Sequence, residues 1–139
     1  MSATGPVVEI GTEIPTLTTR LTRGSLVRYA GVSGDFNPIH YSDFHATALG
    51  LPGVIGHGML TMGLALRAVT DWAGDPARVR GAFVRFTRPI PVPDDEAGAE
   101  LIVSGTVTKI SGGLATVQLD VRHGGEKVLA MATAEVDIS

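Results

Sequence analysis

The chain has 139 residues and no cysteine, a length typical of one domain with a single hydrophobic core. Its composition is 44% hydrophobic and 18% charged, as in globular rather than disordered proteins, and a net charge of −3 gives no basic surface for nucleic acid. The lack of cysteine excludes disulfides, thiolate nucleophiles and cysteine-ligated metal sites.

The N-terminal segment, Met1 to Pro6, has neither a basic region nor an apolar stretch, so we predict no secretory signal. No apolar run approaches the length of a membrane-spanning helix. We therefore expect one domain over residues 1–139, located in the cytoplasm.

The first half of the chain predicts short elements separated by helix breakers. They are a strand or arm at residues 10–22 with an interruption at Pro15, a short helix ending at Tyr29, and a second short helix ending at Leu49. Thr22 or Ser25 can cap the first helix, and Ser42 or Asp43 the second, through side-chain oxygens that accept backbone N–H bonds.

Residues 59–72 form the longest helical candidate. The segment is apolar on nearly every face, and Arg67 and Asp71 are its only charged residues. Because a helix that is hydrophobic all round belongs in an interior, we predict that this helix is buried on every side.

The second half of the chain predicts strands, because apolar and polar residues alternate with a period of two. The strands are expected at residues 79–87, 101–108, 115–122 and 128–138, with glycine-rich turns at 111–113 and 123–125 that make the last three an antiparallel meander. The alternation places Leu129 and Met131 on the second face of the sheet, together with Leu114. A buried helix followed by such strands indicates an α+β fold with the sheet wrapped around the helix.

Asp35 and His40 lie five residues apart in the segment Ser33-Gly34-Asp35-Phe36-Asn37-Pro38-Ile39-His40. Pro38 fixes its own φ and keeps Asn37 out of the helical region, so the segment is expected to be a rigid loop. A rigid loop can hold a carboxylate and an imidazole toward one point, as general acid–base catalysis requires. The alternative is an Asx turn with a helix-capping aspartate and a surface histidine.

A second candidate segment, Gly56-His57-Gly58, lies where the long helix is expected to begin. A helix start exposes unpaired N–H groups, and glycine lets a carbonyl approach the backbone closely. Close helix packing is the alternative role of both glycines. His57 is expected to pack against the loop, and Asn37 either to hydrogen-bond in the site or to close the turn.

The histidine spacing does not indicate a metal site. None of the four histidines forms a His-x-His or His-x-x-x-His pair, and no carboxylate cluster lies nearby. The chain also lacks a glycine-rich phosphate-binding motif. We therefore predict neither a metal nor an organic cofactor.

The Ser33–His40 segment followed by His57-Gly58-Met59 resembles the signature of the MaoC-like (R)-specific enoyl hydratases and dehydratases. That signature runs Ser/Thr-Gly-Asp-x-Asn-Pro-aliphatic-His and is followed by His-Gly-Met. Within this family, the segments Tyr29–Asp35, Gly58–Gly63, Val84–Thr87 and Pro91–Pro93 look most like the catalytic B subunit of the actinobacterial type II fatty-acid-synthase dehydratase. A weaker likeness at Phe86–Asp94 has altered proline spacing, and we attach no function to it.

The resemblance implies a single hot-dog domain that catalyses reversible dehydration of (3R)-hydroxyacyl thioesters to trans-2-enoyl thioesters. It implies that Asp35 and His40 act on one water, and that the Gly58 N–H binds the enolate oxygen. It also implies an acyl carrier protein or coenzyme A thioester as substrate, and either a homodimer or a heterodimer with a hot-dog subunit lacking the Asp–His pair.

Two other function classes stay open. A hot-dog thioesterase would place a carboxylate on the central helix, where Asp71 lies near the wrong end. A non-catalytic acyl-binding subunit would have no use for Asp35 and His40, both of which are present.

Overall fold

The computed structural model describes residues 7–139. The N-terminal segment, from which we predicted no signal peptide, lies outside the described residues. Across residues 7–139, no helix combines the length and the apolar character needed to cross a membrane.

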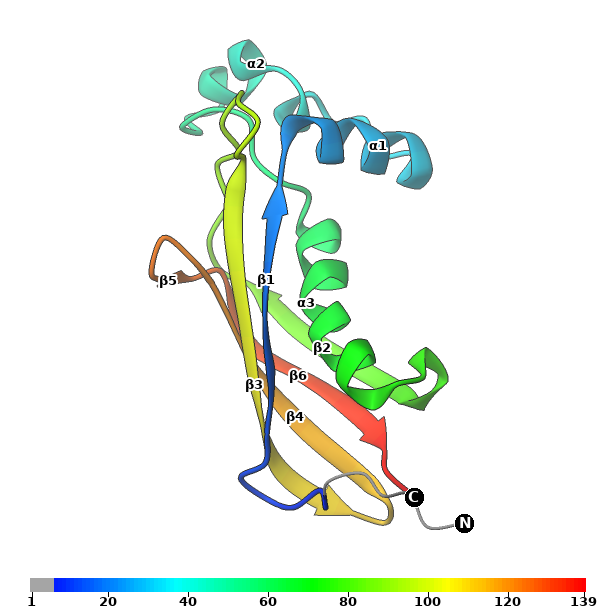
Figure 1. Ribbon diagram of the computed structural model, residues 1–139. Helices are drawn as coiled ribbons and strands as arrows, with labels where there is room; N and C mark the ends of the chain where they lie inside the picture. The colour runs from blue at the N-terminus through cyan, green and yellow to red at the C-terminus, as the bar shows by residue number, and fades with distance from the viewer. Residues whose placement is uncertain (1–6) are drawn as a thin grey trace.

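One twisted antiparallel sheet forms most of the molecule (Figure 1). Its strand order is β1-β3-β4-β6-β2, and a short strand β5 pairs with β4. The strands are β1 Glu13–Leu21, β2 Val79–Phe86, β3 Ala99–Ser111, β4 Leu114–His123, β5 Glu126–Lys127 and β6 Leu129–Asp137. The predicted meander is confirmed as β3-β4-β6, whereas β5 was not predicted because two residues carry no alternation.

A single long helix, α3 (Gly58–Ala73), packs on one face of this sheet (Figure 1). Its bounds agree with the prediction, but the prediction of burial on every side is wrong for this chain. The buried residues are Thr61, Ala65, Ala68 and Val69, whereas Met59 is 59% exposed. The helix therefore buries one face against the sheet, and its opposite side, with Met59, Gly63, Arg67 and Asp71, is exposed.

The short helices gather at one end of the sheet, beyond the N-terminal end of α3 (Figure 1). They are α1 (Arg23–Ser33), the 3₁₀ turn η1 (Pro38–His40) and α2 (Asp43–Ala48), while a second 3₁₀ turn, η2 (Pro76–Arg78), follows α3. Thr22 caps α1 in a reciprocal capping box with Ser25, and Ser42 caps α2. Helix α1 runs four residues beyond the predicted end at Tyr29, to Ser33.

Strand β6 contains an irregularity that the alternation did not predict. Phe83 of β2 pairs with Thr133, and Arg85 pairs with Ala130, so two residues of β6 lie opposite Val84 alone. This is a β-bulge, and its residue Met131 has a left-handed φ of 50°. The placement of Leu129 on the second face is therefore wrong, since its side chain is 3% exposed and belongs to the core.

Candidate active site

The end of α1 positions Asp35. Gly34 closes the helix in the left-handed region with φ 76°, and the Ser33 hydroxyl accepts the Asp35 N–H at 3.1 Å. The Asp35 Oδ1 atom accepts the Asn37 N–H at 3.2 Å. This bond forms the Asx turn that the sequence offered as the alternative interpretation of the loop. One carboxylate oxygen thus orders the loop, and Oδ2 is left for another partner.

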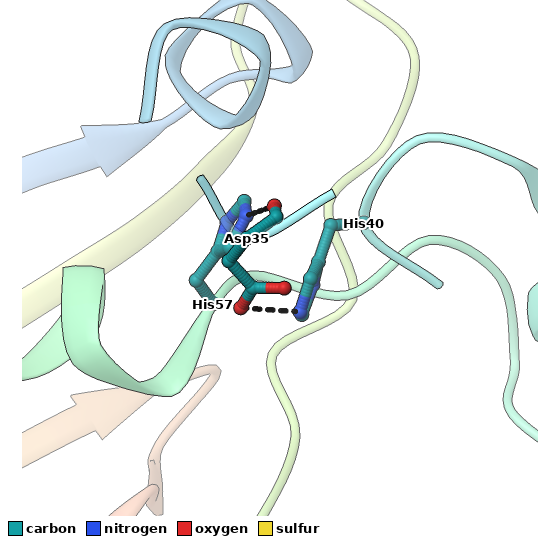
Figure 2. Close-up of side chains that lie close together, drawn as sticks. All are labelled: Asp35, His40 and His57. Carbon is teal, nitrogen blue, oxygen red and sulfur yellow. Dashed lines mark hydrogen bonds and ion pairs between the residues drawn. The ribbon is translucent and has the colours of Figure 1, made fainter. Parts of the chain in front are cut away.

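His40 supplies that partner from η1. Its Nδ1 donates to the Ile55 carbonyl at 2.8 Å, so in the neutral ring Nε2 carries the lone pair. Nε2 lies 3.8 Å from Asp35 Oδ2, too far for a direct hydrogen bond (Figure 2). Two acceptors at this spacing suit a donor such as a water molecule between them. The structure therefore brings Asp35 and His40 together as predicted.

His57 lies close to both residues of this pair (Figure 2). Its ring stacks on His40 with 3.8 Å between the ring centroids, and its Nε2 donates to the Asp35 carbonyl at 3.3 Å. Tyr29 covers another side of the ring at a centroid distance of 4.8 Å. Burial lowers the pKa of His57, and charge on His40 lowers it further. His57 is therefore held neutral, in the packing position that we expected.

Gly58 begins α3, where the first N–H groups have no partner within the helix. It lines a pocket of about 320 Å³, and His40 lines the same pocket. A Cβ atom at position 58 would lie 3.1–3.3 Å from three ring atoms of Phe86, so the Phe86 ring packs directly on this glycine. The alternative role of close packing fits both glycines, since a Cβ at Gly56 would lie 3.2 Å from the Leu21 side chain. The Gly56 N–H already donates to the Ile90 carbonyl at 2.9 Å, so it is not available to a substrate.

Asn37 performs the second of its two candidate roles in this structure. Its Oδ1 accepts the Ile39 N–H at 3.2 Å and caps η1. This bond closes the turn between the two candidate catalytic side chains. A contact between Asn37 and a substrate stays a prediction.

Asp35, His40 and His57 are close enough to suggest a metal site, because one ligand atom of each lies within 4.8 Å of the others. The ring orientations disfavour one. The two imidazole rings are stacked with their planes inclined by only 22°, so their in-plane lone pairs lie in two separate, nearly parallel planes and do not converge on an ion at about 2.0–2.1 Å. The absence of a metal stays a prediction.

Sequence reasoning missed the contacts that hold the site to its surroundings. Arg23 donates to both carboxylate oxygens of Asp43, at 3.0 and 3.2 Å, and to the Val92 carbonyl at 2.6 Å. Asp43 also accepts the Val54 N–H at 2.9 Å, and this bond, together with Arg23, lowers the pKa of Asp43. No local pattern in the sequence indicates such long-range pairing.

Comparisons with known proteins agree with the motif. The family described as MaoC like domain matches residues 7–124. "3-Hydroxyacyl-thioester dehydratase X" of Mycobacterium tuberculosis is 40% identical over 79 residues, which are 57% of this chain and 27% of that protein. "3-Oxo-4,17-pregnadiene-20-carboxyl-CoA hydratase beta subunit", also of M. tuberculosis, is 31% identical and covers 82% of both chains. A solved structure titled "MaoC-like dehydratase" superposes with a TM-score of 0.90 and 40% identity, over 95% of this chain and 41% of that one.

The chain thus spans about a quarter of the length of the first of these relatives and 41% of the solved structure. The overlap includes the α+β architecture, with the antiparallel sheet and long helix of the hot-dog fold.

Proposed function

The chain belongs to the MaoC-like domain family, and we propose that it is a hydro-lyase that interconverts (3R)-hydroxyacyl thioesters and trans-2-enoyl thioesters. The observation that carries this proposal is the Asp35–His40 pair, held 3.8 Å apart beside the pocket that Gly58 lines. The names of two relatives, a hydroxyacyl-thioester dehydratase and a coenzyme A thioester hydratase, support the same reaction class.

In the hydration direction, a water between Asp35 Oδ2 and His40 Nε2 gives one proton to the pair as its oxygen bonds to the β-carbon. The electrons of the C=C bond move to the thioester and form an enolate. The same pair then returns a proton to the α-carbon, so that the sum of the steps is the addition of one water. General acid–base catalysis of this kind contributes about 10²–10⁴-fold in rate.

The enolate oxygen requires a donor that is in place before the reaction. The Gly58 N–H fits this role, because it begins α3, where the helix dipole favours negative charge, and because Gly58 and His40 line one pocket. The Phe86 ring packs beside this donor. One such donor contributes about 10²–10³-fold in rate.

The thioesterase alternative is not supported by the position of its carboxylate. Asp71 lies thirteen residues after Gly58 on α3, which is about 20 Å along a helix axis. Asp71 lines a different pocket of about 130 Å³, together with Pro15 and Trp72. The non-catalytic alternative leaves the ordered Asp35–His40 pair without a use.

We further propose that the substrate arrives on an acyl carrier protein or coenzyme A, and that the chain acts as a dimer. The partner is a second copy or a hot-dog subunit that lacks the Asp–His pair. The uncovered face of α3 and the unpaired edge of β2 support this assembly, as does the relative that is named a beta subunit.

Incubation of the purified chain with crotonyl-CoA tests the proposal. Loss of the enoyl absorbance with formation of (3R)-hydroxybutyryl-CoA is expected, and the Asp35→Asn variant should lack this activity. Release of free thiol would favour the thioesterase, and the absence of both reactions would favour a non-catalytic subunit.

A further inference from the structure

The bulge in β6 determines which side chain reaches the pocket. On the C-terminal side of the bulge, Ala132, Ala134 and Val136 are buried, as the regular alternation predicts. Met131 and Ala132 together lie opposite Val84, so the alternation changes phase between Ala132 and Ala130. Leu129 therefore joins the buried face, while Met131 is 62% exposed.

This change of phase places Leu129 in the wall of the pocket beside the candidate active site. Leu129 is the ladder partner of Phe86, and the Phe86 ring packs on Gly58. All three residues line the same pocket. Leu129 therefore lines the same pocket as the proposed enolate donor.

The pocket has an apolar inner end and an exposed rim. Its inner end consists of buried residues, namely Thr61 at 3%, Ile90 at 3%, Val128 at 2% and Leu129 at 3% exposed, and its rim of the exposed residues Phe86, Thr87, Arg88 and Pro89. An apolar acyl group gains more from the inner end than a polar carrier does, because its transfer from water to apolar surroundings is favourable. Of the apolar side chains there, Leu129 is the one that the bulge brings inward.

We propose that Leu129 is a specificity-determining residue, whose side chain limits the length of the acyl group that the pocket accepts. This inference rests on the proposed function, because it takes the occupant of the pocket to be the acyl group of an enoyl thioester. Shortening Leu129 lengthens the apolar space, and enlarging it shortens that space. Each methylene admitted or excluded by an apolar pocket changes kcat/KM by about 10–200-fold.

The test compares kcat/KM for trans-2-octenoyl-CoA and crotonyl-CoA, expressed as the ratio of the longer to the shorter substrate. Leu129→Ala should raise this ratio at least about ten-fold, and Leu129→Phe should lower it. A ratio that stays at the wild-type value in both variants overturns the inference, since the pocket then holds a part that the two substrates share.

Ala130→Leu is the matched control. Ala130 pairs with Arg85 on the opposite face, so this variant should keep the wild-type ratio. If Ala130→Leu lowered the ratio and Leu129→Ala did not raise it, the regular alternation would hold in solution and the inference would be wrong. Leu129→Val, which removes a single methylene, should raise the ratio by a smaller factor and serves if Leu129→Ala does not fold.

The activity of the wild-type chain separates the two proposals. An active wild type whose ratio is insensitive to Leu129 contradicts only the specificity role. A folded wild type that hydrates neither substrate contradicts the proposed function and this inference together.

Discussion

The imidazole of His57, which is buried, stacks on that of His40 with 3.8 Å between the ring centroids. Two buried cations at this distance would repel strongly, so the stack is stable when His57 is neutral. Its Nε2–H donates to the Asp35 carbonyl, which ties the second histidine to the backbone of the catalytic loop. A neutral His57 can thus order both Asp35 and His40 without competing for the proton that they transfer.

The lowered pKa of His57 predicts a pH dependence of stability. Unfolding releases His57 to its ordinary pKa near 6.5, so in mildly acidic solution the unfolded state binds more protons than the folded state. The free energy of unfolding should therefore fall as the pH decreases from about 6.5, by no more than about 1.4 kcal/mol per pH unit for this one group.

Urea unfolding between pH 5 and 7.5 measures this dependence, with His57→Phe as the variant that removes the titrating group. The variant should show a shallower loss of stability toward low pH than the wild type. Equal slopes in wild type and His57→Phe would contradict the assignment.

The Asp35–His40 pair predicts a non-additive loss of activity. Asp35→Asn and His40→Ala should each reduce kcat for crotonyl-CoA hydration by about 10²–10⁴-fold. Because both side chains act on one water, the double variant should be little worse than either single variant. Multiplicative losses, measured in proteins with unchanged circular dichroism, would show that the two groups act independently.

The sequence was sufficient for the parts of the fold that local patterns determine. Thr22 and Ser42 mark the starts of the short helices by capping, and the glycine-rich turns delimit the meander. The motif from Asp35 to His40 was also sufficient to bring the two side chains of the site together, because Pro38 fixes the loop between them.

Long-range features were not predictable in the same way. The face of the sheet on which Leu129 lies depends on one additional residue in β6. No turn signal or glycine in the sequence marks the bulge at Met131. The burial of α3 is smaller than its apolar composition predicts, because the sheet covers one side of the helix and leaves Met59 on the other side exposed. The Arg23–Asp43 contact joins residues 20 positions apart, which no local pattern indicates.

Substitutions of Gly58 should reduce hydratase activity in two different ways. Gly58→Pro removes the N–H that is proposed to bind the enolate oxygen, and kcat should fall by about 10²–10³-fold. Gly58→Ala keeps the N–H but brings a Cβ within 3.1 Å of the Phe86 ring, so its loss should come from crowding. Replacing Phe86 with the smaller leucine relieves this crowding, so the double variant Gly58→Ala/Phe86→Leu should regain part of the activity. The double variant Gly58→Pro/Phe86→Leu still lacks the N–H and should stay inactive. Full activity of Gly58→Pro would place the oxyanion donor elsewhere.

The last prediction concerns assembly. Ala82 of β2 pairs with Ala134, which is fully buried, yet Ala82 itself is exposed because β2 is the edge of the sheet. Met59 on the outer face of α3 is exposed as well. An unpaired strand edge and an exposed apolar side chain on the helix are liabilities that a second hot-dog subunit would cover. Light scattering at micromolar concentration should therefore show no monomer.

Charge introduced on these surfaces should dissociate the dimer, because a lysine buried in an interface is costly to desolvate. Ala82→Lys and Met59→Lys should each yield monomer and lose hydratase activity, although neither touches Asp35 or His40. Thr108→Lys, at an exposed position on β3, is the matched control and should remain dimeric and active. If the wild type were an active, stable monomer, the site would be complete within one chain, and the proposed partner subunit would be unnecessary.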